Sequence, residues 1–284
     1  MRLVLRQQSN AFPQLWCCNP FARDGSPSGA HQQHSAVAIS TNPPSIPGSH
    51  LNAPQPYRTR HYNFQIKVAQ VLSDFDFPGR KLPAAFRYTG PFVDRAARKE
   101  ISFPWSQLDS SRPLVFVSMG TLQNGIKEVY RVIAETCAEF PAQTVLALGG
   151  SLAPEALGPL PGHPIIARYA PQLDLLRKSA LAVFHGGLNT GIAQLRRMIA
   201  IPVRLDQPGV GARLLWKGTG KAIPVHALKS CRLRPAIREV LGTGRYRAQA
   251  KALQRQIASI RGVERAAELV EHSLAISRPT VPVA

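Results

Sequence analysis

The sequence has few acidic residues and few cysteines, and it lacks any long apolar run. Because 16 Asp and Glu stand against 35 Lys and Arg, the formal net charge is +19, which favours anionic ligands such as nucleotides. The four cysteines have no spacing typical of zinc ligands, so we expect free thiols and no metal site. No apolar stretch reaches the roughly 18 residues that span a bilayer, and the N-terminus lacks a secretory signal pattern. We therefore expect a cytoplasmic protein.

The positive charges are scattered along the chain rather than gathered in one block. Near residues 251–265 they recur at a spacing that fits the solvated face of helices. No RNA-binding aromatic motif or zinc finger is present, so we expect no specific nucleic-acid partner. The excess of basic residues also leaves open a peripheral contact with an anionic membrane.

Composition divides the chain into four segments. Residues 1–60 are rich in Ser, Pro, Asn, Gln and His and show little periodicity, so we expect a disordered low-complexity extension. Residues 61–110 read as an anchored but irregular connector, the remnant of the end of a preceding domain. Residues 111–276 carry regular patterning and form the expected ligand-binding domain. Residues 277–284 are a tail.

Short apolar segments alternate with helical patterns throughout the ligand-binding domain. This alternation predicts an α/β fold, a Rossmann-like parallel sheet with helices on both faces. The expected strands are Leu114–Val117, Thr144–Leu148, Pro164–Ala167, Ala182–Phe184, Met198–Val203 and Ala222–Pro224. The expected helices include one with Ile126, Val129, Tyr130, Ile133, Ala134 and Cys137 on one face, and others over Leu173–Lys178, Arg234–Leu241, Tyr246–Ile260 and Val263–Ile276.

Several polar residues and turns follow directly after predicted strands. They are Ser118, Gly149, Tyr169, His185 and Asp206. In a parallel sheet these positions share one edge, where ligands bind. After His185, two glycines and a helix start offer backbone N–H groups and room for a phosphate. The order suggests a nucleotide-sugar site.

A structural interpretation stands beside each of these assignments. His185 fits a turn, Tyr169 fits a core position at a strand end, and Asp206 fits the N-cap of the next helix. Ser118 and Thr121 fit ordinary turns, and Gly149-Gly150 fits a tight turn.

Five ordered motifs give the chain a resemblance to a known family. They are Tyr88-Thr89-Gly90-Pro91-Phe92, Val117-Ser118-Met119-Gly120-Thr121, Tyr169-Ala170-Pro171-Gln172, His185 to Thr190, and Asp206-Gln207-Pro208-Gly209. Residues 62–274 resemble the UDP-dependent glycosyltransferases of the two-Rossmann-domain (GT-B) class, most of all bacterial enzymes that glycosylate macrolides and carotenoids. The resemblance implies transfer of a sugar from a UDP-sugar to a lipophilic acceptor hydroxyl, with no cofactor and no metal.

The resemblance also implies a role for each motif in binding the donor. Tyr169 would stack on the uracil, the Ala170 backbone would read the base edge, and Gln172 would approach the ribose. The phosphates would lie against His185, Gly187, Asn189, Thr190, Ser118 and Thr121. Asp206 and Gln207 would hold the sugar hydroxyls, because a carboxylate and an amide together accept and donate hydrogen bonds.

The sequence departs from the family pattern in three places. The glutamate that holds the ribose is replaced by Ala193, and about three residues are missing before Met198. The N-terminal acceptor domain is largely missing from the pattern, and with it the catalytic base, so the catalytic residue is unknown. We therefore predict a glycosyltransferase-like chain that does not turn over alone. The alternative is a non-catalytic nucleotide- or partner-binding module.

Overall fold

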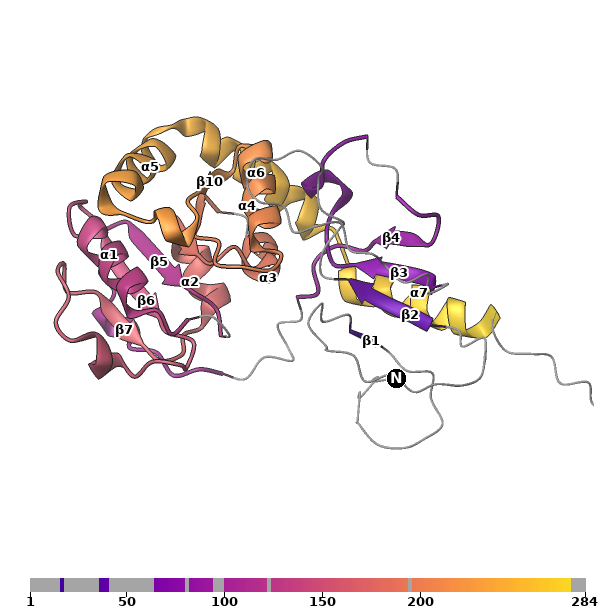
Figure 1. Cartoon of the computed structure of the whole chain (residues 1–284), viewed down its shortest axis with the longest axis horizontal. Coiled ribbons are helices and arrows are strands. Elements are labelled where there is room, and N and C mark those ends of the chain that lie inside the picture. Colours follow the sequence, from indigo (N-terminus) through magenta and orange to yellow (C-terminus); the bar gives the residue numbers. More distant parts are fainter. Residues whose placement is uncertain are drawn as a thin grey trace, which may run out of the picture.

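The computed structural model describes residues 16–17, 36–40, 64–79, 82–93, 100–121, 124–193 and 196–276. Within these ranges the chain forms a six-stranded sheet and a four-stranded sheet, and all the strand pairs in both are parallel. The two sheets lie at opposite ends of the molecule shown in Figure 1.

The six-stranded sheet has the order β10-β9-β8-β5-β6-β7. Its strands are β5 Leu114–Ser118, β6 Gln143–Ala147, β7 Ile165–Ala167, β8 Leu181–Phe184, β9 Met198–Ala200 and β10 Gly220–Ala222. From β5 the chain adds strands on one side, and then it crosses over and adds β8, β9 and β10 on the other side. The order therefore reverses between β5 and β8, which is the switch point where doubly wound sheets bind ligands.

Helices cover both faces of this sheet, as predicted. They are α1 Lys127–Cys137, α2 Gln172–Lys178, α3 Leu188–Ala193, α4 Gln207–Lys217, α5 Ser230–Gly242 and α6 Gly244–Ala258. Short 3-10 turns lie at η1 Ser73–Phe75, η2 Trp105–Gln107, η3 Pro154–Leu157 and η4 Val225–Ala227. One apolar cluster lies between the sheet and α1 and α5, and a second lies between the sheet and α2, α3 and α4.

The helix α1 shows how the apolar spacing produces this packing. Val129, Tyr130, Ile133 and Cys137 recur every three or four residues and are buried against the sheet. Ile126 was expected on the same face, but it precedes the first helical residue and is 40% exposed. That part of the prediction is corrected, because a residue outside the helix does not follow its period.

The four-stranded sheet lies in segments for which we expected disorder or irregular structure. Its strands, in the order β1-β2-β3-β4, are β1 Trp16–Cys17, β2 Ala36–Ser40, β3 Phe64–Ala69 and β4 Phe86–Tyr88. The expectation of disorder is therefore corrected for β1 and β2, and that of an irregular connector for β3 and β4. These strands pair with segments far away in sequence, so local composition carries little sign of them. The rest of residues 1–60 and the 277–284 tail lie outside the described residues.

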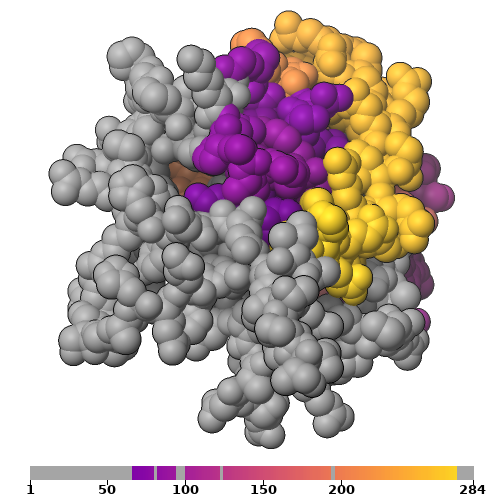
Figure 2. All heavy atoms as spheres, turned by 90° about the vertical axis from the view of Figure 1, so that its right-hand side faces the viewer, coloured from indigo at the N-terminus to yellow at the C-terminus, as the bar shows by residue number. Residues whose placement is uncertain are grey.

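The last helix, α7 Gly262–Ile276, leaves the large sheet and packs on the small one. Ile66 and Val68 of β3 contact Ala266, and Leu269 and Val270 pack against the same cluster. Figure 2 shows the yellow C-terminal residues adjoining purple residues of the N-terminal part on one face of the molecule. The two ends of the described chain are thus joined in one structural unit. Among the described residues, no helix is both long and apolar enough to cross a bilayer.

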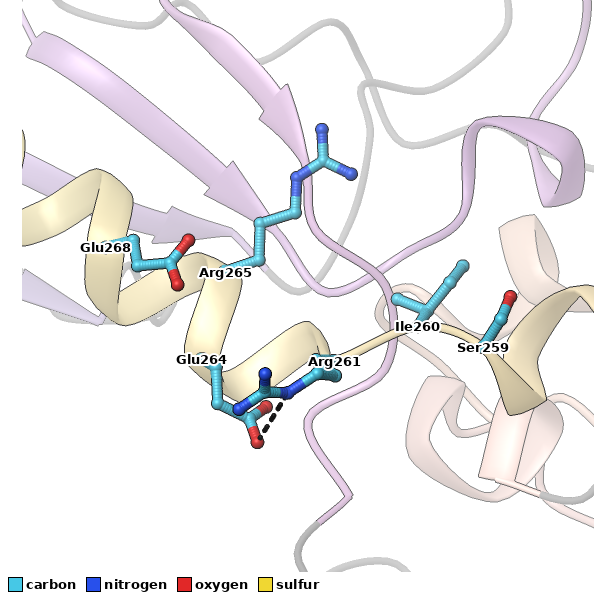
Figure 3. A pocket seen from close by; sticks show the side chains of 6 residues that line it. All are labelled: Ser259, Ile260, Arg261, Glu264, Arg265 and Glu268. Carbon is cyan, nitrogen blue, oxygen red and sulfur yellow. Dashed lines mark hydrogen bonds and ion pairs between the residues drawn. The ribbon is translucent and has the colours of Figure 1, made fainter.

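The chain passes from α6 to α7 through a short junction that crosses the segment after β4 at close range (Figure 3). A Cβ placed on Gly262 would lie 2.4 Å from the carbonyl oxygen of Pro91, and a Cβ on Gly90 would lie 2.5 Å from Cγ2 of Ile260. Gly90 also has φ +93°, a conformation that other residues rarely adopt. The two connections therefore meet in a contact that requires glycine on both sides.

Gly262→Ala should lower the free energy of unfolding by about 1–3 kcal/mol, because the methyl group overlaps a backbone oxygen that cannot rotate away. Urea denaturation measures the change. Gly244→Ala is the matched control, since Gly244 also begins a helix but a Cβ there meets nothing within 4 Å. Equal stability of the two variants would contradict the close crossing.

Candidate nucleotide-sugar site

The loops that leave β5 and β8 meet around the side chain of His185. A Cβ placed on Gly120, after β5, would lie 2.7 Å from Cε1 of His185. A Cβ on Gly187, after β8, would lie 2.3 Å from Nε2 of the same ring. The imidazole therefore occupies the space between the two glycines, at the switch point of the sheet. We expected the glycines to leave room for a phosphate, but at Gly187 the free space is filled by the His185 ring.

The environment of His185 favours a neutral imidazole. Burial lowers the pKa of His185, and the smaller opposing effects of the Ser118 backbone and of Asp206 do not reverse this. Its Nδ1 is buried and has no hydrogen-bond partner among the described residues. A neutral imidazole carries one N–H donor, which suits a contact with an anion.

The loop after β8 also contacts the first turn of α4. Gly186 has φ +85°, and a Cβ there would lie 3.0 Å from the carbonyl oxygen of Gln207. Gln207 is buried, and its Oε1 accepts hydrogen bonds from the backbone N–H groups of Val203 at 2.8 Å and Arg204 at 3.2 Å. This use of Oε1 closes the turn before α4. The predicted contact of Gln207 with sugar hydroxyls stays a prediction.

Asp206 occupies the N-cap position of α4 but makes no side-chain capping hydrogen bond. It is half-buried, and its carboxylate is near enough to His185 to influence the pKa of that histidine. The alternative interpretation of Asp206 as a capping residue is therefore not supported by a hydrogen bond.

Tyr169 lies at the exposed end of β7 rather than in the core. It is 51% exposed, and a Cβ placed on Gly150 would lie 2.1 Å from its hydroxyl oxygen. Gly149 in turn packs on the loop after β5, since its Cβ would lie 1.9 Å from the carbonyl oxygen of Gly120. Contacts thus run without a break from Tyr169 through the two loops to His185.

The remaining predicted residues lie in the same loops. Nε2 of Gln172, at the start of α2, donates to Oγ1 of Thr190 in α3 at 2.9 Å. Oγ of Ser118 is buried and accepts from the backbone N–H of Gly120 at 3.3 Å. Ala170 and Thr190 are buried, whereas Thr121 and Asn189 are exposed. No group of three His, Cys, Asp or Glu side chains in the described ranges could hold a metal ion.

Sequence reasoning assigned no role in the site to four further residues. Asn124 is fully buried, donates from Nδ2 to the carbonyl oxygen of Leu148, and has an Oδ1 with no partner in the described part of the chain. Asp76 and the partly buried Tyr88 form a polar cluster with Arg213 of α4. The one local signal was an arginine three residues after Val210, on the apolar face of a helix.

The strand order and the loops at the switch point define a doubly wound α/β domain with the GT-B fold. The chain belongs to the family described as UDP-glucoronosyl and UDP-glucosyl transferase, whose model matches residues 51–265. The hollow beside the α6–α7 junction in Figure 3 contains none of the predicted donor residues.

Proteins similar to this chain are glycosyltransferases by name, as expected for this family. The chain is 28% identical to the zeaxanthin glucosyltransferase of Pantoea ananas over 240 residues, which cover 82% of this chain and 55% of the relative. The structure is similar to that of CalG4, the calicheamicin glycosyltransferase, with a TM-score of 0.67, 19% identity, and coverage of 87% of this chain and 71% of that one. It is also similar to the spinosyn rhamnosyltransferase SpnG complexed with thymidine diphosphate, with a TM-score of 0.64, 17% identity, and coverage of 84% and 68%.

The chain spans about half the length of the curated relatives it matches, between 45% and 55% for the first of them. The comparisons at under 25% identity establish the fold.

Proposed function

We propose that this chain binds a nucleotide sugar through its diphosphate, at the edge where β5 and β8 end. The observation that carries the proposal is the imidazole of His185 held between Gly120 and Gly187 at the switch point. Helix starts and small loops at this edge supply backbone N–H groups, which favour negative charge. The strongly positive chain adds a long-range attraction for such an anion.

The two ends of the ligand follow from the contacts around His185. Tyr169 has an exposed ring that offers a stacking surface for a base, and stacking is worth about 1–3 kcal/mol. On the other side, Asp206 and the first turn of α4 lie by the same loop, where the sugar would sit. We propose UDP as the nucleotide because the family is named for UDP-sugar donors.

For the whole enzyme we propose transfer of the sugar to a hydroxyl group of a lipophilic acceptor. Zeaxanthin, which appears in the name of the Pantoea relative, is an acceptor of this kind. We assign no catalytic base, because His185 is the one histidine of the described ranges that we link to this site, and we propose that it binds the diphosphate. The absence of a cofactor or metal from the reaction, and peripheral contact with a membrane, stay predictions.

Ala193 favours a second candidate, a non-catalytic nucleotide-binding module. A methyl group cannot accept a hydrogen bond from a ribose hydroxyl, so the donor would be held less tightly than in the family pattern. Release of UDP from UDP-glucose, measured with and without a panel of lipophilic alcohols, distinguishes an enzyme from a module.

His185→Ala should weaken UDP binding by about tenfold or more while changing uridine binding little, because the lost hydrogen bond is to the charged diphosphate. Titration calorimetry with both ligands tests this. His226→Ala serves as the control, since His226 is an exposed histidine in η4. Equal losses of affinity for the two ligands would contradict a contact between His185 and the phosphates. If the unmodified chain does not bind UDP at millimolar concentration, the proposed function is overturned.

A further inference from the structure

A buried ion pair joins Asp76, in the segment after β3, to Arg213 of α4. Oδ1 of Asp76 accepts hydrogen bonds from Nε of Arg213 at 3.1 Å and from Nη2 at 2.9 Å. Oδ2 of Asp76 accepts from the hydroxyl of Tyr88 at 2.7 Å. The Asp76 and Arg213 side chains are 1% and 4% exposed, so water does not compete for these bonds.

The same guanidinium reaches the first turn of α4. Nη1 of Arg213 donates to the carbonyl oxygen of Gly209 at 3.0 Å. Gly209 lies three residues after Asp206, and the N–H of Val210 bonds to the Asp206 carbonyl at 3.2 Å. One side chain therefore links a carboxylate outside the large sheet to the turn that carries the predicted sugar ligands.

The surroundings of the pair are largely apolar. Val71, Leu72 and Phe75 pack in one cluster with Val210 and Leu214 of α4. The guanidinium carbon of Arg213 lies 5.3 Å from the centre of the Phe77 ring. Apolar contacts tolerate small shifts of a helix, whereas the two N–H groups of Arg213 that converge on Oδ1 of Asp76 restrict both the distance and the direction of the side chain. The ion pair is thus the part of this interface that fixes the position of α4.

We propose that Asp76 is a positioning residue for the sugar end of the donor site and acts through Arg213 on the first turn of α4. The inference rests on the proposed function, since it assigns a role within the same site. It makes recognition of the sugar depend on a residue that contacts no part of the nucleotide. The N-terminal segment then contributes to donor selection as well as to packing.

The test compares the dissociation constants of UDP and UDP-glucose by calorimetry in the full chain and in Asp76→Asn. In the variant the ratio of the two constants should shift against UDP-glucose by about threefold to tenfold, while the constant for UDP stays within about twofold. Tyr88→Phe removes only the third hydrogen bond and should give a smaller shift in the same direction. If Asp76→Asn does not fold, Tyr88→Phe tests the proposal in its place.

Glu139→Gln is the control, because Glu139 pairs with Arg234 at the surface away from these residues. A role in stability alone would weaken UDP and UDP-glucose equally, or neither. If the unmodified chain binds UDP but the ratio is unchanged in both Asp76→Asn and Tyr88→Phe, the positioning role is overturned and the proposed function stands. If the unmodified chain binds neither ligand, both proposals fall.

Discussion

Replacing Arg213 with methionine should lower the free energy of unfolding by about 3–5 kcal/mol, because it leaves the carboxylate of Asp76 buried without its cation. The Asp76 side chain is 1% exposed, and the hydroxyl of Tyr88 donates a hydrogen bond to its Oδ2 at 2.7 Å. The neutral hydroxyl of Tyr88 cannot replace the positive charge of Arg213 beside a buried carboxylate. Urea denaturation followed by circular dichroism measures the loss.

Two further variants make this prediction specific. The double variant Asp76→Leu with Arg213→Met removes both charges together, so it should recover much of the lost stability. Arg234→Met breaks an exposed ion pair with Glu139 and should change stability little, because solvent already screens that pair. A small loss in Arg213→Met itself would show that the pair is hydrated in solution.

Restoring a carboxylate at position 193 should tighten UDP binding by about tenfold to hundredfold, the gain expected from a charge-assisted hydrogen bond of about 1.5–3 kcal/mol. Ala193 is the last residue of α3, one helical turn after Thr190. Thr190 is bonded to Gln172, which we predict lies by the ribose. Titration calorimetry of Ala193→Glu with UDP measures the effect.

Ala193→Gln is the matched control, because it adds the same length without the charge and should tighten binding less. Uridine should follow UDP in Ala193→Glu, since the new bond is to the ribose that both ligands share. An unchanged dissociation constant in Ala193→Glu would place the ribose elsewhere and would contradict the correspondence of position 193 with the family's glutamate.

Much of the large sheet was predictable from local pattern. The segment Leu114–Ser118 is a continuous apolar run that ends in a serine, and it forms β5, buried on both faces. Such runs are typical of parallel strands covered by helices, so their number and their positions along the chain follow from the sequence. The small sheet was not predictable in this way. The five residues of β2 lie between polar and proline-rich segments, and their partner in β3 lies more than twenty residues away.

The candidate site was also predictable only in part. Spacing alone placed Tyr169, His185 and Asp206 after three strands, and the fold brings their loops into one chain of contacts. Spacing did not show that Gly187 makes room for the imidazole, or that Oε1 of Gln207 is bonded to backbone. Both facts depend on the direction of a side chain, which a motif does not contain.

The sequence by itself determined the family, the parallel sheet and the edge at which we propose that a ligand binds, because apolar runs and loop motifs are local properties of the chain. Only the tertiary structure decided which side chains hold that edge in place. Asp76 and Arg213 are 137 residues apart, and each is an ordinary charged residue when read alone. They form one buried contact because the packing of the apolar residues around them excludes water, and a buried charge is stable only when it is paired.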